Sequence, residues 1–231
     1  MISNMPNEGL ILAVDGPSGT GKSTTCRALA KQLDAKYVDT GAMYRVATLA
    51  VLREGVDPAD TAAVMAATAD LPLGVSDDPD STEVLLAGED VSRVIREDEV
   101  TRNVSAVSAI PEVRENLVAL QRKLAREAHR AIVEGRDIGT VVLADAPAKA
   151  FMTASAEVRA QRRQAQNEKA GIASDYETVL ADVQRRDAAD SSRKASPLRP
   201  AEDATLVDTS NMSPEDVLEA LINVVKESVN D

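Results

Sequence analysis

The chain has 231 residues with an apolar fraction of 44%, enough to bury the core of one large α/β domain or of two small ones. Its 26 basic and 38 acidic residues give a formal net charge of −12, and it has no Trp, one Phe and three Tyr, so neither a nucleic-acid backbone nor unstacked bases are expected as partners. A single cysteine excludes an intramolecular disulfide framework, and no apolar run approaches the length of a membrane span.

The first segments along the chain predict a strand followed by a helix. Met1–Gly9 is polar, without a basic start or an apolar run, so it does not resemble a signal peptide, and we expect a cytoplasmic protein with no membrane partner. The apolar run Leu10–Val14 predicts a buried strand, and Ser23–Leu33 predicts a helix. Cys26 on that helix is predicted to be a small buried thiol.

The stretch between them fits the pattern G-x-x-x-x-G-K-[ST] of a phosphate-binding P-loop. In that strand–loop–helix context, backbone N–H groups and the helix N-terminus cradle phosphate oxygens. We predict that Lys22 reaches the β- and γ-phosphates of a nucleoside triphosphate and that the Ser23 hydroxyl faces Mg²⁺. The residues predicted to bind ATP are Gly16, Pro17, Ser18, Gly19, Thr20, Gly21, Lys22, Ser23 and Thr24. The pattern alone leaves kinases, GTPases and motors open.

Helices and a small β region are predicted next. The ranges are a strand at Lys36–Val38, and helices at Gly41–Arg53, Pro58–Ala69, Glu97–Ala109 and Pro111–Arg126. Between the second and third of these helices, residues 71–92 have the texture of short strands and turns. There Glu83–Leu86 and Val91 predict a hairpin with the polar turn Ala87–Asp90. We expect this stretch to be a small β insertion outside the main sheet.

The second half alternates strands with helices. Strands are predicted at Ala131–Val133, Ala148–Met152 and Thr205–Val207, and helices at Ser155–Lys169, after a Ser174-x-x-Glu177 capping box, and from Ser213-Pro214 onward. Alternation of this kind predicts a parallel sheet covered on both faces, with ligands at the carboxyl ends of its strands. No linker is long enough to separate independent domains, so residues 1–231 are predicted to form one unit.

Arginine is the distinctive residue of that half. Arg159, Arg162 and Arg163 fall on one helix face, and Arg185, Arg186, Arg193 and Arg199 follow within Gln184–Pro200. In a strongly acidic chain with a P-loop, this surplus favours a mobile lid over triphosphate rather than a solvated face. The segments Asp39–Arg45 and Glu134–Thr140 each combine an arginine with a carboxylate at a strand end, which indicates a second phosphate site. His129 stands outside any catalytic grouping, which disfavours a Ser–His or Cys–His hydrolase.

Seven segments resemble, in order, those of bacterial cytidylate kinases: GPSGTGKST, YVDTGAMYR, SAIPEVRE, EGRDIGTVV, APAKAFMTAS, RRDAADSSRKASPLRPAEDA and LVDTS. The resemblance runs from Leu10 to Asp208. It implies a monomeric α/β protein of the P-loop kinase fold, with a parallel β-sheet core flanked by helices. It also implies a monophosphate-binding region at 40–127 that contains the small antiparallel β insertion 71–92, and a helical lid with its flanking segment at 157–200. The implied reaction is transfer of the γ-phosphoryl group of ATP, with Mg²⁺, to CMP and dCMP.

The same resemblance assigns site residues. Cytosine offers an exocyclic amine beside two acceptors, so a carboxylate such as Asp137 can accept from the amine while Arg114 donates to the acceptors. Uracil presents a carbonyl where cytosine has the amine, and this carbonyl would oppose Asp137. The implied CMP-binding residues are Thr40, Tyr44, Arg45, Ser105, Arg114, Arg136, Asp137, Arg186, Asp190 and Arg193. The implied catalytic residues are Lys22, Arg136, Arg159 and Arg163, and the implied Mg²⁺ residues are Ser23, through its hydroxyl, and Glu134, through water.

Three alternatives remain open at this point. The nearest is a P-loop nucleoside monophosphate kinase directed at UMP or dTMP. A regulatory P-loop GTPase would carry a guanine-reading N-K-x-D segment, which the sequence does not contain. An ATPase acting on nucleic acid is disfavoured by the acidic charge and the scarcity of aromatic residues.

Overall fold

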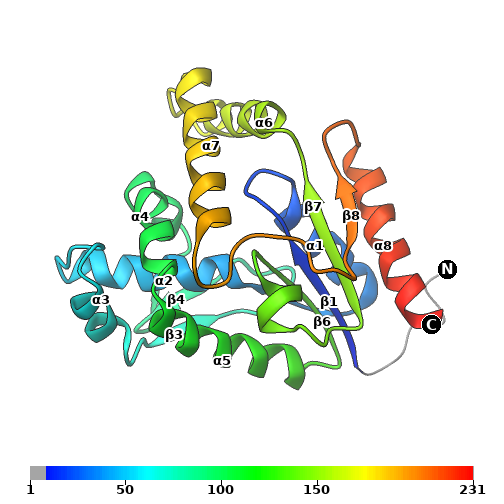
Figure 1. Cartoon of the computed structure of the whole chain (residues 1–231), viewed down its shortest axis with the longest axis horizontal. Helices are drawn as coiled ribbons and strands as arrows, with labels where there is room; N and C mark the ends of the chain where they lie inside the picture. The colour runs from blue at the N-terminus through cyan, green and yellow to red at the C-terminus, as the bar shows by residue number, and fades with distance from the viewer. Residues whose placement is uncertain (1–8, 231) are drawn as a thin grey trace.

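The computed structural model describes residues 9–230, so the polar N-terminal segment Met1–Gly9 lies, except for Gly9, outside the described residues. Its centre is a five-stranded sheet (Figure 1) in the order β2–β6–β1–β7–β8. The strands are β1 (Leu10–Asp15), β2 (Lys36–Asp39), β6 (Arg130–Gly135), β7 (Ala148–Thr153) and β8 (Thr205–Asp208). Every neighbouring pair is parallel, as the alternation of strands and helices predicted.

Alternate residues of the central strand β1 belong to two hydrophobic cores on opposite faces of the sheet. Ala13 packs with residues of α2 (Thr40–Arg53) and α5 (Pro111–Glu127). Leu12 and Val14 pack with residues of α1 (Lys22–Leu33) and α8 (Pro214–Asn230). Cys26 lies in this second core, as predicted, and burial raises the pKa of its thiol. Within residues 9–230, none of the helices combines the length and apolar character that crossing a bilayer demands.

The predicted β insertion is a separate antiparallel sheet of β3 (Leu73–Val75), β4 (Val84–Leu86) and β5 (Glu89–Asp90). The predicted four-residue turn is wrong. Ala87 and Gly88 alone form the turn with φ of 52° and 83°, and the two residues after them pair with β4. Positive φ at both central residues matches the right-handed twist of a tight hairpin. The buried side chains of β4 face α2, so this small sheet is fastened to the helix that begins at the end of β2.

Further helices complete these layers and the region of the small sheet. They are α3 (Thr61–Thr68), the short η1 (Val94–Arg96), α4 (Asp98–Ser108), α6 (Ala156–Lys169) and α7 (Tyr176–Ser192). α6 and α7 pack together at the top of the view in Figure 1, and α7 also contacts α4.

Two sequence predictions about these helices need correction. α3 is shorter than Pro58–Ala69 because the Asp60 side chain accepts from the Ala63 N–H and fixes the helix start. The Ser174-x-x-Glu177 box does not cap α7, because Asp175 accepts from the Thr178 N–H at 2.9 Å and takes that place. In addition, residues 138–142 form a wide helical turn, η2 (Ile138–Val142), that no pattern in the sequence predicted.

Candidate active site

A cleft of about 800 Å³ opens where β1, β2 and β6 end, bounded by α2, α4, α6 and α7. Among the described residues, twelve cationic side chains line it against seven carboxylates. The cleft is therefore locally basic in a chain whose net charge is −12. The positive potential of such a cleft attracts small anions that can enter it, whereas the acidic surface around it repels long polyanions.

Most of the predicted site residues line this cleft. They are Ser18, Gly19, Gly21, Lys22, Ser23, Thr24, Thr40, Tyr44, Arg45, Ser105, Arg114, Glu134, Arg136, Asp137, Arg159, Arg163, Arg186, Asp190 and Arg193. The exceptions are Gly16, Pro17 and Thr20, which lie inside the loop. The Thr20 hydroxyl donates to the Pro17 carbonyl, and a Cβ on Gly16 would come within 2.0 Å of the Met152 carbonyl oxygen.

The P-loop is shaped by its own backbone and by Lys22. Gly21 has a φ of 94° and stands at the N-cap of α1 without a side-chain cap, so the first N–H groups of the helix face the cleft unblocked by a side chain. The Lys22 ammonium donates to the carbonyls of Gly16 and Pro17 at 2.6 and 2.7 Å. Burial, and then the Arg136 charge, lowers the pKa of Lys22 to about 7. An incoming phosphate would oppose that shift and favour the charged ammonium.

Three oxygen-bearing side chains meet beside the P-loop. Ser23 donates to Glu134 Oε1 at 2.7 Å, while the buried Oε2 lacks a hydrogen-bond partner among the described residues. Burial, followed by repulsion from Asp39, raises the pKa of Glu134 to about 7. A hydroxyl beside crowded carboxylates is a hard-oxygen donor set of the kind Mg²⁺ prefers, with phosphates and water completing its coordination. A divalent cation here would satisfy the orphaned oxygen and relieve the repulsion between the two acids.

Three arginines crowd together on the far side of the cleft. Burial lowers the pKa of Arg45 and of Arg186 to about 10, and repulsion from neighbouring guanidinium groups adds to the lowering at each residue. Arg136 contributes to the lowering at both residues, and its own Nε donates to Asp190 at 3.1 Å. Arg45 and Arg186 remain charged at neutral pH, so a phosphate dianion bound here would relieve the repulsion within the cluster.

A buried ion pair lies next to that cluster. Arg114 donates to Asp137 at 2.5 Å, and the two side chains are 5% and 4% exposed. The second guanidinium nitrogen donates to the Ser108 carbonyl, and the guanidinium lies 5.1 Å from the centre of the Tyr44 ring. Thr40 closes this corner by donating to the Glu134 carbonyl at 2.7 Å. The group therefore offers a fixed acceptor and a fixed donor side by side.

The arginines of α6 divide into different environments. Arg159 is buried and makes a two-pronged pair with Asp187 of α7, which ties the two helices together. Arg162 donates to the carbonyl and hydroxyl of Thr209 at 2.6 and 3.1 Å. Arg163 lines the cleft, as do both of the others. The predicted arginine face of the helix is thus turned toward the cleft.

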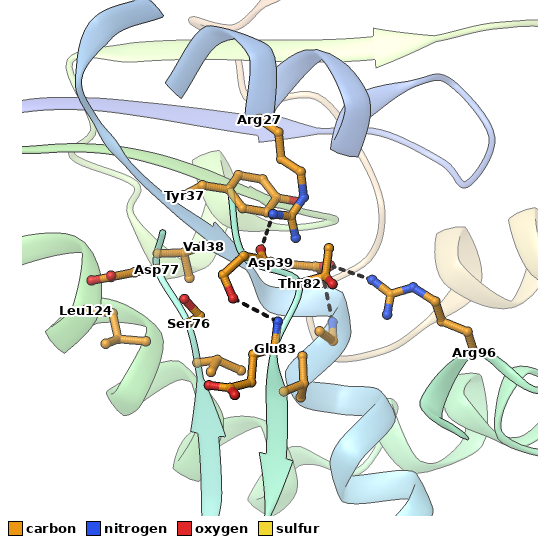
Figure 2. Close-up of a pocket in the computed structure, with 14 residues that line it drawn as sticks. Arg27, Tyr37, Val38, Asp39, Ser76, Asp77, Thr82, Glu83, Arg96 and Leu124 are labelled. Carbon is orange, nitrogen blue, oxygen red and sulfur yellow. Dashed lines mark hydrogen bonds and ion pairs between the residues drawn. The ribbon is translucent and has the colours of Figure 1, made fainter. Parts of the chain in front are cut away.

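The loop of the β insertion is fastened close to the P-loop helix. Figure 2 shows Arg27 of α1 lying over the Tyr37 ring, 4.3 Å from its centre, and Arg96 directed toward Asp39 at 3.9 Å. Arg27 also donates to the carbonyls of Pro79 and Ser81. The hollow that these residues line measures about 10 Å³, room for about one water molecule, so it is no substrate site.

Sequence reasoning missed several residues that hold the site together. Thr101 accepts from Arg45 at 2.9 Å, and the Thr209 hydroxyl lies 3.0 and 3.1 Å from the carbonyls of Thr20 and Thr153, either of which can accept its one proton. Asp187 lies within the RRDAADSSR segment that resembles the cytidylate kinases, so this motif could have indicated it as a site residue. No periodicity or spacing points to the two threonines, because their partners come from remote parts of the chain.

Comparison of the sequence with known proteins shows the family to which the chain belongs. A family model described as Cytidylate kinase matches residues 12–227. The chain is similar to proteins named Cytidylate kinase from Corynebacterium glutamicum (70% identical, covering 97% of each chain), Corynebacterium diphtheriae (64%, again 97% of each) and Mycobacterium avium (56%, covering 94% of this chain and 96% of that one).

Solved structures with low sequence identity share the fold alone. A gluconokinase from Sinorhizobium meliloti aligns with a TM-score of 0.51 at 13% identity, covering 96% of this chain and 94% of its own. An uncharacterized protein from Eubacterium ventriosum has the same score and identity, with 95% and 99% covered.

Proposed function

Because this chain belongs to the cytidylate kinase family, we propose that its cleft holds two nucleotides, with ATP on the P-loop and the monophosphate among α2, α5 and the end of β6. The chain is a kinase, and the reaction of its family is the phosphorylation of CMP. The observation that carries the two-nucleotide arrangement is the crowded cluster of Arg45, Arg136 and Arg186 beside the buried Arg114–Asp137 pair.

The arginine cluster suits the acceptor phosphate. Arg45 and Arg136 bind the 5′-phosphate of CMP, whose negative charge offsets the repulsion between the guanidinium groups. An oxygen of that phosphate attacks the γ-phosphorus of ATP, and ADP leaves. No protein base is needed, because the second pKa of a phosphate monoester is about 6 and the acceptor is largely a dianion at neutral pH.

The buried ion pair suits the cytosine ring. Asp137 accepts from the exocyclic amine, while Arg114 donates to the ring acceptors and is held in place by Ser108 and Tyr44. Arg193 and Thr40 complete the ring contacts. Ser105, Arg186 and Asp190 line the cleft where the sugar hydroxyls would lie, and we propose that dCMP is a substrate alongside CMP.

The P-loop side suits MgATP. Lys22, Arg159 and Arg163 neutralise charge that develops on the transferred phosphoryl group. The Ser23 hydroxyl and Glu134 fit Mg²⁺, Glu134 acting through water, because they present hard oxygens and one buried oxygen without a partner. When bound, the ion would screen the β- and γ-phosphate charges.

Residues 157–200 are proposed to act as a lid, and residues 40–127 as the monophosphate-binding region with its β insertion. Closure of α6 and α7 over the cleft would exclude water and suppress hydrolysis of ATP. We propose that the whole chain works as one monomeric unit, with small-molecule substrates and no nucleic-acid partner.

The test is a coupled ADP-release assay with CMP, dCMP, UMP, AMP and dTMP as acceptors. CMP and dCMP should give the highest kcat/KM, and chelation with EDTA should stop turnover until Mg²⁺ is restored. Arg136→Ala should raise KM for CMP and lower kcat, whereas Arg126→Ala, at an exposed pair with Asp145, should change neither. A higher kcat/KM with UMP or dTMP than with CMP would overturn the base assignment, and normal CMP kinetics in Arg136→Ala would overturn the phosphate assignment.

A further inference from the structure

A buried carboxylate joins the strand that carries the P-loop to the segment that carries Arg136 and Asp137. Asp15 is the last residue of β1 and is 3% exposed. Its two oxygens accept separately from the N–H groups of Ile138 and Gly139, at 2.8 and 2.7 Å. The chain between the partners is more than a hundred residues long, so this contact is purely tertiary.

The segment that Asp15 holds has no local cap of its own. Asp137 stands at the N-terminal boundary of η2 and makes no side-chain cap hydrogen bond there, since its carboxylate contacts Arg114. The two N–H groups at the start of this turn are therefore satisfied by Asp15 alone among the described side chains. A buried N–H without a partner is costly, so the carboxylate fixes where the backbone after Asp137 runs.

The position of Asp15 is an unfavourable one for a carboxylate. The residues before it in β1 are apolar, and all of them except the partly buried Ile11 are buried. Burial, with repulsion from Asp137, raises the pKa of Asp15. The Gly139 and Ile138 N–H groups and Lys22 oppose this effect but do not cancel it, so the pKa remains raised, at about 6. An apolar residue would suit strand packing better, which indicates that the carboxylate serves the two N–H groups.

We propose that Asp15 is a positioning residue for the acceptor nucleotide, because it holds the backbone that presents Arg136 and Asp137 to the monophosphate. The proposal rests on the function proposed above. Since Gly16 follows directly, Asp15 also sets the distance between the donor loop and the acceptor contacts. Asp15 touches neither nucleotide in this arrangement, and it acts through the Arg136–Gly139 backbone.

The test is Asp15→Asn, which keeps the shape but turns an amide NH₂ toward one of the two backbone N–H groups. We expect kcat/KM for CMP to fall by roughly 5- to 150-fold, the effect of leaving one buried donor unpaired. The loss should fall on KM for CMP, while the affinity for a non-hydrolysable ATP analogue changes by less than about twofold. The matched control is Asp216→Asn, which makes the same change at an exposed carboxylate that accepts from the Ser213 N–H at the start of α8, and it should leave the kinetics unaltered.

The outcomes separate this inference from the proposed function. A wild-type protein that does not phosphorylate CMP would remove the proposed function itself. An active wild type with unchanged kinetics in Asp15→Asn, or with equal losses of CMP and ATP affinity, would overturn only the role of Asp15. If the variant does not fold, amide hydrogen exchange in the wild type decides. Slow exchange at Ile138 and Gly139 is expected, and exchange at the rate of an exposed turn would refute the contact.

Discussion

Replacing Asp137 by Asn should weaken the preference of the enzyme for cytosine over uracil. The carboxylate is 4% exposed and pairs with Arg114 at 2.5 Å. The amide oxygen of Asn can still accept from Arg114, which leaves the NH₂ group facing the base. That group opposes the exocyclic amine of cytosine and suits the carbonyl that uracil carries at the same position.

The magnitude follows from burial. Opposing two donors in a closed site leaves both unpaired, which costs about 1–3 kcal/mol, or about 5- to 150-fold in kcat/KM. We therefore expect the CMP:UMP ratio of kcat/KM to fall by about that factor. Loss of the charge on one side of a buried ion pair also destabilises the fold, by about 3–5 kcal/mol where no partner is left. The retained oxygen keeps the cost for Asn below that range.

Steady-state rates with CMP and UMP, at a temperature where circular dichroism shows the variant folded, give the ratio directly. Asp145→Asn is the matched control, because Asp145 also pairs with an arginine of α5 but is 74% exposed, and its ratio should match that of the wild type. An Asp137→Asn variant that loses CMP and UMP activity equally would refute the reasoning, because Asp137 would then support Arg114 without reading the base.

Two further predictions concern the donor side of the cleft. Lys22→Ala should lower kcat by about 10²- to 10³-fold, the usual effect of removing a group that stabilises transition-state charge, and a rate near that of the wild type would contradict its assignment. Burial raises the pKa of Asp15 from 3.8 to about 6, so the folded protein retains a proton that the unfolded chain releases, and this group's contribution to stability falls as pH rises from about 4 to 6. The free energy of unfolding of the wild type relative to Asp15→Asn should therefore fall by about 3 kcal/mol between pH 3 and pH 7 in denaturant titrations, and a difference independent of pH would contradict the shift.

Local patterns were enough for the main elements. The apolar run before the P-loop and the helical spacing after it gave β1 and α1 within about one residue, because both are set by neighbours in sequence. The errors lie at a helix cap and at a turn. Asp175 rather than Ser174 caps α7, and the hairpin turn of the β insertion is two residues long rather than four. Such choices differ by little free energy, so spacing alone does not decide them.

The sequence by itself determined that the chain is a P-loop protein with a second, arginine-rich site, and its motifs indicated the family. Only the tertiary structure decided which charges meet. Arg114 pairs with Asp137, Arg159 with Asp187, and Asp15 with the N–H groups of Ile138 and Gly139. These partners lie far apart along the chain and are brought together by the register of parallel strands and the packing of helices over their carboxyl ends. Periodicity reports only which face a residue occupies, so it carries no information about the remote group that the face will meet.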